Sequence, residues 1–204
     1  MKRNQYTLGK PISFKGNGLH SGIPVTLTMR PAPAGSGIIF RRIDLTGAPE
    51  VPAKSEFVTN TLRATTLERG DAKVFTVEHI LSALFALRID NCILEMDAPE
   101  PPVADGGALT FSQMILKAGI VELEKQTDIL TLETSVAVYE DNKFITALPY
   151  DGLRITFTSI NPHPLLGTQM KDFIIDKETY IRGSAKAVRW KTLSFILKRT
   201  ACQN

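Results

Sequence analysis

The stretch Thr76-Val77-Glu78-His79-Ile80-Leu81-Ser82-Ala83 places a carboxylate beside an imidazole at the start of a predicted helix. Its apolar residues recur at helical spacing and predict a helix that extends to about Arg88, with Thr76 as the N-cap. Glu78 then falls in the first turn, where the helix dipole favours a negative charge. The stripe facing the core is expected to contain Val77, Leu81, Leu84 and Phe85.

Glu78 and His79 are the two kinds of group that a zinc hydrolase needs at its reaction centre. A neutral His79 would donate a ring nitrogen to Zn²⁺, which lowers the pKa of a bound water to about 7. Adjacent helical side chains project about 100° apart, so Glu78 would act as general base on that water rather than bind the same ion. The alternative is an exposed or capping carboxylate beside a partly buried imidazole, with no catalytic role.

The other two histidines give weaker indications. His20 lies in the loop Gly16-Asn17-Gly18-Leu19-His20-Ser21-Gly22, whose three glycines predict positive φ or a close backbone approach. It is either a loop residue with satisfied hydrogen bonds or a substrate contact. His163 stands between two prolines and is expected to face solvent.

The composition indicates an ordinary globular protein. The 204 residues are 43% hydrophobic, which is enough for one large or two small domains with a core. The net charge of +3 comes without a Lys/Arg stripe, so we expect no nucleic-acid partner. Cys92 is expected in the core, and neither it nor Cys202 has the spacing of a metal site. Two lone cysteines, no signal peptide and no long apolar run predict a cytoplasmic protein without a membrane span.

Outside the central helix, the pattern predicts an alternation of strands and helices. Strands are expected over 6–14, 23–30, 38–40, 91–97, 129–138, 143–148 and 153–160. Further helices are expected over 110–118, ending at Gly119 as a left-handed C-cap, and from 177 to 182. The polar run 125–127 is interpreted as a domain boundary, because a second set of strands follows it.

Several stretches, in this order and spacing, resemble the UDP-3-O-acyl-N-acetylglucosamine deacetylase family, the zinc enzymes of lipid A biosynthesis. They extend over about residues 5–187, and many collinear motifs are far more specific than one. The matching stretches are 18–22, 25–33, 40–45, 64–67, 76–84, 89–91, 102–106 and 118–120.

The resemblance implies an α+β fold of two domains of similar topology, with the active site between them. Residues 1–124 would form a first complete domain with helices layered against β-sheet, and 128–187 an incomplete second domain. The family hydrolyses the N-acetyl group of a UDP-linked acylated glucosamine. By this resemblance His79 matches a zinc ligand and Glu78 the general base. Leu19 and Leu62 match positions near the passage for the acyl chain.

The sequence departs from the family where the remaining zinc ligands are expected. The family supplies a His and an Asp four residues later, but His20 and His163 are followed at that spacing by Pro24 and Gly167. The family's later His is also missing. So is its Arg-Thr-Phe segment, and residues 188–204 form a tail without a match.

Two departures concern the nucleotide and the loop near it. Asn161 stands where the family has an aromatic residue for uridine stacking, and Gly107 where it has a serine. We therefore expect a truncated and inactive form of the deacetylase. The alternatives are a non-catalytic module that binds a nucleotide sugar or an acyl chain and, less supported, a basic nucleic-acid binder.

Overall fold

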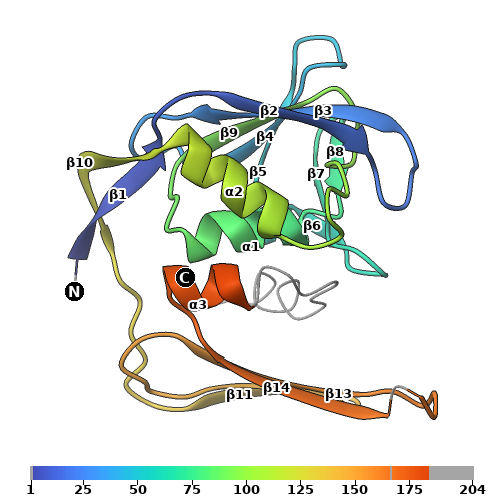
Figure 1. Ribbon diagram of the computed structural model, residues 1–204, viewed down its shortest axis with the longest axis vertical. Coiled ribbons are helices and arrows are strands. Elements are labelled where there is room, and N and C mark those ends of the chain that lie inside the picture. The colour runs from blue at the N-terminus through green and yellow to red at the C-terminus, as the bar shows by residue number, and fades with distance from the viewer. Residues whose placement is uncertain (1, 166, 184–204) are drawn as a thin grey trace.

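The computed structural model describes residues 2–165 and 167–183, and its fold is α+β, as predicted. A five-stranded sheet carries helices α1 and α2 on one face (Figure 1). Strands β9 and β4 run parallel, and the other neighbours in the sheet are antiparallel. In spatial order the strands are β2 (Ile12–Asn17), β3 (Pro24–Pro31), β9 (Cys92–Met96), β4 (Ile38–Arg42) and β5 (Glu50–Pro52).

The core lies between this sheet and the two helices, α1 (Glu78–Ala86) and α2 (Leu109–Ala118). Phe85 was predicted in the buried stripe, but it is 64% exposed, so that prediction is wrong. Gly119 ends α2 with φ 79° and ψ 156°, a positive φ outside the left-handed helical region that was predicted. Fully buried side chains include Leu27, Met29, Phe40, Leu94 and Met96 from the sheet and Ile80, Leu84, Phe111 and Ile115 from the helices.

The predicted core cysteine is confirmed. Cys92 starts β9, is fully buried, and burial raises the pKa of its thiol to about 12. Cys202 and the predicted tail 188–204 lie outside the described residues. Within the part of the chain that the structure describes, no helix is long and apolar enough to cross a membrane.

Two smaller sheets accompany the five-stranded sheet, and one of them leads into α1. Strands β6 (Val58–Asn60), β7 (Thr66–Arg69) and β8 (Ala72–Phe75) form an antiparallel sheet after the short 3₁₀ helix η1 (Ser55–Phe57). Strand β8 runs directly into the turn before α1, so it fixes where that helix begins.

The second small sheet pairs β1 (Lys2–Leu8) with β10 (Ile120–Asp128). It corrects one prediction, because the strand expected over 6–14 is divided between β1 and β2. The polar run 125–127 lies inside β10. Most side chains of β10 are exposed or half-buried, so its polar composition resembles that of a linker although its backbone is paired.

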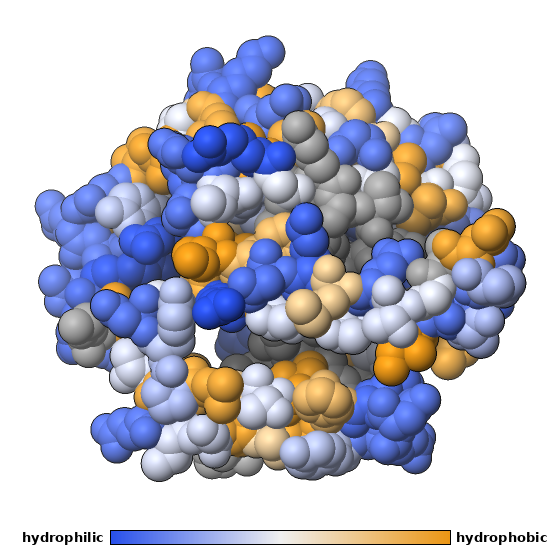
Figure 2. Space-filling model, turned by 60° about the horizontal axis from the view of Figure 1, so that its bottom comes forward, coloured by the Kyte–Doolittle hydropathy of each residue, from blue (hydrophilic) through white to orange (hydrophobic). Residues whose placement is uncertain are grey.

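Two hairpins follow β10. The strand expected over 129–138 begins only at Val136, because residues 129–135 connect β10 to the first hairpin. Figure 1 shows helix α3 (Lys177–Arg182) between α1 and these hairpins. Figure 2 turns the bottom of the Figure 1 view forward, and hydrophobic side chains reach the surface on this face. The hairpins are β11 (Val136–Glu140) with β12 (Lys143–Ala147), and β13 (Arg154–Ile160) with β14 (Thr168–Ile174).

Tyr180 fastens α3 to α1. Its side chain is only 4% exposed, and its hydroxyl lies 2.5 Å from the hydroxyl of Ser82. Burial raises the pKa of Tyr180 to about 12, although the hydrogen bond with Ser82 opposes that shift. Because Ser82 lies one helical turn after Glu78, this contact places α3 beside the polar start of α1.

Replacing Tyr180 by phenylalanine should lower the free energy of unfolding by about 1 kcal/mol at pH 7, since one largely buried hydrogen bond is lost. The pKa of Tyr180 is raised from its ordinary 10.0 to about 12, so its contribution is complete below pH 10 and is lost as the pH rises toward 12. Urea unfolding followed by circular dichroism at pH 7, 9 and 11 measures both effects.

The matched control is Tyr139→Phe, because Tyr139 is 72% exposed and its ring stacks on Phe144. That variant should unfold like the parent at every pH. Equal stability of Tyr180→Phe and Tyr139→Phe would contradict the role given to the buried hydroxyl.

Candidate active site

The turn before α1 differs from the predicted N-cap. Helix α1 begins at Glu78, its N-cap is Val77, and no side chain caps it. Thr76 has φ 58°, in the left-handed region, and its hydroxyl donates to Glu100 rather than to the helix. The prediction that Thr76 caps the helix is therefore wrong, because its hydroxyl donates to the buried carboxylate of Glu100 instead.

Glu78 and His79 lie side by side at this helix start, and both are half-buried. Glu78 Oε1 accepts a hydrogen bond from the backbone N–H of Thr65 at 2.5 Å. Thr65 lies in the loop before β7, so the carboxylate is oriented by a segment outside its own helix. Both side chains are therefore partly exposed to solvent and not enclosed in the apolar core.

Glu100 is a functional candidate that reasoning from the sequence missed. Its side chain is fully buried, yet it accepts hydrogen bonds from two loops. The donors to Oε1 are the N–H of His20 at 3.1 Å and the hydroxyl of Thr76 at 2.7 Å. Those to Oε2 are the N–H and hydroxyl of Ser21, at 2.8 and 2.7 Å, and again the N–H of His20 at 3.1 Å.

The signal for Glu100 was present in the sequence. It is the one acidic residue in the apolar and proline-rich run Ala98-Pro99-Glu100-Pro101-Pro102. Burial alone would raise the pKa of Glu100, but the hydrogen bonds from Ser21, Thr76 and His20 lower it below its ordinary value. The carboxylate is therefore held in its charged form inside the protein.

The glycine loop behaves as its composition predicts. A Cβ atom at Gly18 would overlap the hydroxyl of Ser21 and the carboxylate of Glu100, so only glycine permits this close approach. Gly22 has φ 65°, the other feature that was expected. The loop is shorter than predicted, because Gly16 belongs to β2.

Of the two remaining histidines, His20 lies near the start of α1 and His163 does not. The backbone of His20 reaches the carboxylate that also holds Thr76, while its side chain is exposed. His163 lies in the turn between β13 and β14, exposed as predicted, and its Nδ1 accepts from the N–H of Leu165 at 3.2 Å.

The residues present do not fit a zinc ion. Catalytic zinc sites use about three protein ligands. Among residues 2–165 and 167–183, no group of three or more His, Cys, Asp and Glu side chains is close enough to hold a metal. Within that part of the chain, His79 is therefore a single candidate ligand rather than part of an assembled metal centre.

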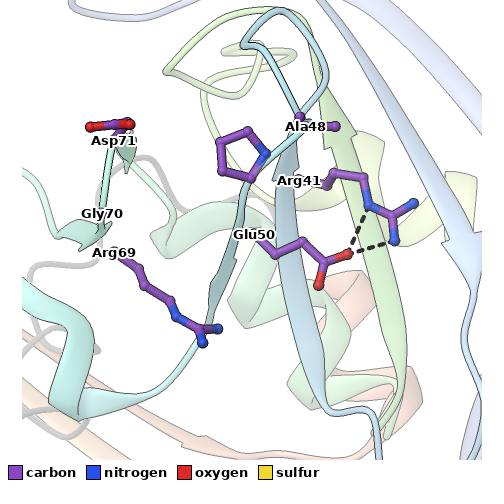
Figure 3. Close-up of a pocket in the computed structure, with 8 residues that line it drawn as sticks. Arg41, Ala48, Glu50, Arg69, Gly70 and Asp71 are labelled. Carbon is purple, nitrogen blue, oxygen red and sulfur yellow. Dashed lines mark hydrogen bonds and ion pairs between the residues drawn. The ribbon is translucent and has the colours of Figure 1, made fainter.

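A shallow pocket of about 680 Å³ lies elsewhere, between the β4–β5 connection and the β7–β8 turn (Figure 3). Glu50 lies 2.6 Å from Arg41, and Arg69 lies over the ring of Phe57. Two arginines and two acidic residues line the pocket, so their charges cancel, and none of the candidate site residues is among them. The pocket is lined by Arg41, Gly47, Ala48, Pro49, Glu50, Arg69, Gly70 and Asp71.

An α+β fold whose first helix begins with an adjacent carboxylate and imidazole defines a candidate hydrolase. A sequence model of the family described as UDP-3-O-acyl N-acetylglycosamine deacetylase (LpxC) matches residues 5–198. The chain belongs to this family, which confirms the resemblance seen in the sequence. The matched range continues past residue 187, where the collinear stretches ended.

Curated relatives agree with the family assignment. The chain is 40% identical over 200 residues to the UDP-3-O-acyl-N-acetylglucosamine deacetylase of Legionella pneumophila, covering 97% of this chain and 66% of that protein. It is 40% identical over 193 residues to the protein of the same name from Myxococcus xanthus, covering 95% and 60%. The bifunctional enzyme LpxC/FabZ of Chlorobaculum tepidum is 43% identical over 178 residues, covering 86% and 38%. The chain thus spans less than two thirds of each relative's length.

Acid should weaken the fold partly through Glu100. Because its pKa is lowered below the ordinary 4.5, its contribution to stability is complete above pH 4.5 and is lost as the pH falls through the folded value. Glu100→Gln should cost about 2 kcal/mol at pH 7, since charge-assisted hydrogen bonds are lost, and should flatten the decline below pH 4.5. Urea unfolding at pH 7, 4.5 and 3 measures this.

Glu56→Gln is the matched control, since its side chain is 57% exposed and meets only Lys54 at 3.8 Å. It should leave both the stability at pH 7 and the acid decline unchanged. If Glu100→Gln kept the parent's full decline, the hydrogen bonds to Glu100 would not be its source.

Proposed function

We propose that Glu78 and His79 are this chain's share of a hydrolytic site that removes the N-acetyl group of UDP-3-O-acyl-N-acetylglucosamine in lipid A biosynthesis. The observation that carries the proposal is the adjacent carboxylate and imidazole at the accessible start of α1, in a member of this family. The Legionella and Myxococcus relatives carry the name of this deacetylase.

Amide hydrolysis needs a proton taken from water and a proton given to the departing amine, with acetate as the other product. We assign the first transfer to Glu78, whose carboxylate is oriented by the N–H of Thr65. The hydroxyl of the same threonine is buried and has no hydrogen-bond partner among the described residues. A polar group that reaches Glu78 would find a second partner in this hydroxyl.

The acyl chain of the substrate is assigned to two exposed leucines. Leu19 is 41% exposed and precedes His20, in the loop held by Glu100. Leu62 is 80% exposed and lies in the loop that leads to Thr65, which holds Glu78. Both loops therefore connect an exposed apolar side chain to the start of α1, which supports this assignment.

The division into domains and the location of the protein complete the proposal. Residues 1–124 and 128–187 would form a first complete and a second incomplete domain, although the second range extends beyond the described residues. A cytoplasmic location agrees with a buried, reduced Cys92.

The 204-residue chain by itself should retain no zinc and release no acetate, because one imidazole cannot hold the ion tightly. Elemental analysis after exhaustive dialysis, together with an acetate assay on the UDP-linked substrate, measures both. One equivalent of zinc per chain that is lost in His79→Ala would contradict this expectation. Zinc that both proteins retain equally would be bound elsewhere.

Fusing the family's downstream segment to this chain tests the function directly. The fusion should release acetate, and Glu78→Gln should lower its turnover by about 10²- to 10⁴-fold, the usual contribution of a general base. Glu56→Gln is the matched control and should keep full turnover. A fusion that binds zinc and substrate but is unaffected by Glu78→Gln would exclude Glu78 as the base.

The alternative function is a non-catalytic module for a nucleotide sugar or an acyl chain. It is favoured by the absence of an assembled metal centre among the described residues, together with exposed Leu19 and Leu62. In that case the UDP-linked substrate at 100 times its Kd should stabilise the unmodified chain by about 2.7 kcal/mol without turnover. UDP alone should do less, because Asn161 replaces the family's aromatic residue. An unchanged melting temperature with both ligands would exclude this reading.

A further inference from the structure

The backbone at Thr76 is held in a conformation that its residue type disfavours. Its φ of 58° is rare for a β-branched residue and persists only where neighbouring groups enforce it. Two hydrogen bonds do so here. The N–H of Thr76 donates to the carbonyl of Thr65 at 3.1 Å, and its hydroxyl donates to Glu100 at 2.7 Å.

The same oxygen of Glu100 also accepts the N–H of His20. One buried atom therefore joins the glycine loop to the strained turn from which α1 starts, although the two are far apart in sequence. The bonding pattern suits a carboxylate and no other side chain. All the groups around it are donors, and an ionised carboxylate only accepts.

The segment that carries Glu100 is itself fixed on both sides. On one side, the N–H of Val103 donates to the carbonyl of Asn17 at 2.8 Å. On the other, the N–H of Phe75, the last residue of β8, donates to the carbonyl of Pro99 at 3.0 Å. Backbone hydrogen bonds thus hold the segment of Glu100 between the glycine loop and the end of β8, in addition to the bonds of its side chain.

We propose that Glu100 is a positioning residue of the candidate site. It fixes the loop carrying His20 and the turn carrying Thr76 in a single arrangement, which brings His20 and the pair Glu78-His79 to the same end of α1. Glu100 acts through Thr76 and the His20 loop and does not itself touch the substrate. The inference rests on the proposed function only in taking the start of α1 as the reacting end.

The test uses the isotope-labelled 204-residue chain and its Glu100→Gln variant, studied by NMR without metal or substrate. The amide hydrogens of His20 and Ser21 should exchange about tenfold faster or more, because their charged acceptor is lost. The ring signals of His20 and His79 should shift in the folded variant. Core amides such as that of Leu94 exchange by global unfolding and report the loss of stability separately. The ring signals are read in the folded state, so their shifts distinguish a local rearrangement from a general loss of stability.

Glu122→Gln is the matched control. Glu122 also accepts two side-chain hydrogen bonds, from Asn4 and Tyr6, but it lies on the exposed strand β10. This variant should leave the exchange at His20 and both ring signals as in the parent. Unchanged exchange at His20 and Ser21 and unchanged ring signals in Glu100→Gln would overturn the proposal.

Thr76→Val provides a second, milder variant that decides the question if Glu100→Gln does not fold. Valine has nearly the same shape as threonine but lacks the hydroxyl. Thr76→Val should therefore shift the ring signal of His79, whereas Thr76→Ser, which keeps a hydroxyl, should give the parent's signal. A parent-like His79 signal in Thr76→Val would overturn the proposal in that case. Because no readout needs zinc, substrate or turnover, failure of this inference is distinguishable from failure of the proposed deacetylation.

Discussion

A carboxylate removed from water must be surrounded by donors, and the arrangement of the candidate site follows from how Glu100 meets that requirement. Its donors come from the glycine loop and from the turn before α1, so neither segment can move without leaving a buried charge unsatisfied. Gly18 must lack a side chain to let the loop approach, and Thr76 must adopt a positive φ to present its hydroxyl. The strain at Thr76, of about 1–3 kcal/mol, is offset by this network.

Helix α1 contacts the sheet, the loop before β7 and helix α3, and so links these parts of the molecule. Its apolar face is packed on the five-stranded sheet, and its first turn is held through Thr76 and through the bond from Thr65 to Glu78. One turn later, the hydroxyl of Ser82 is hydrogen-bonded to the hydroxyl of Tyr180 on α3. A displacement of α3 would therefore act on the same helix that carries Glu78 and His79.

The parts of the fold that depend on local pattern could be predicted, and those that depend on distant contacts could not. Periodicity located α1 and α2 and placed Glu78 at a helix start, because a helix that buries one face spaces its apolar residues accordingly. Helix α3 also lies where a helix was expected, over 177–182. The N-cap at Thr76 was wrong because its partner, Glu100, is distant in the chain. The strand pairing of residues 125–127 in β10 could not be read from the sequence, because an exposed paired strand has the composition of a linker. The short strands β5 to β7 carried too few residues to show an alternation.

The hydrogen bonds that position the candidate site do not depend on a bound metal. The hydrogen bonds that fix Glu78, Thr76 and the His20 loop are complete within the described residues, although those residues supply only one candidate zinc ligand, His79. An ion bound there would meet groups whose backbone is already fixed, so its affinity would depend on the number of ligands rather than on the cost of ordering the helix start. The framework that orients Glu78 and fixes the start of α1 is thus formed by the described residues themselves, whatever completes the site.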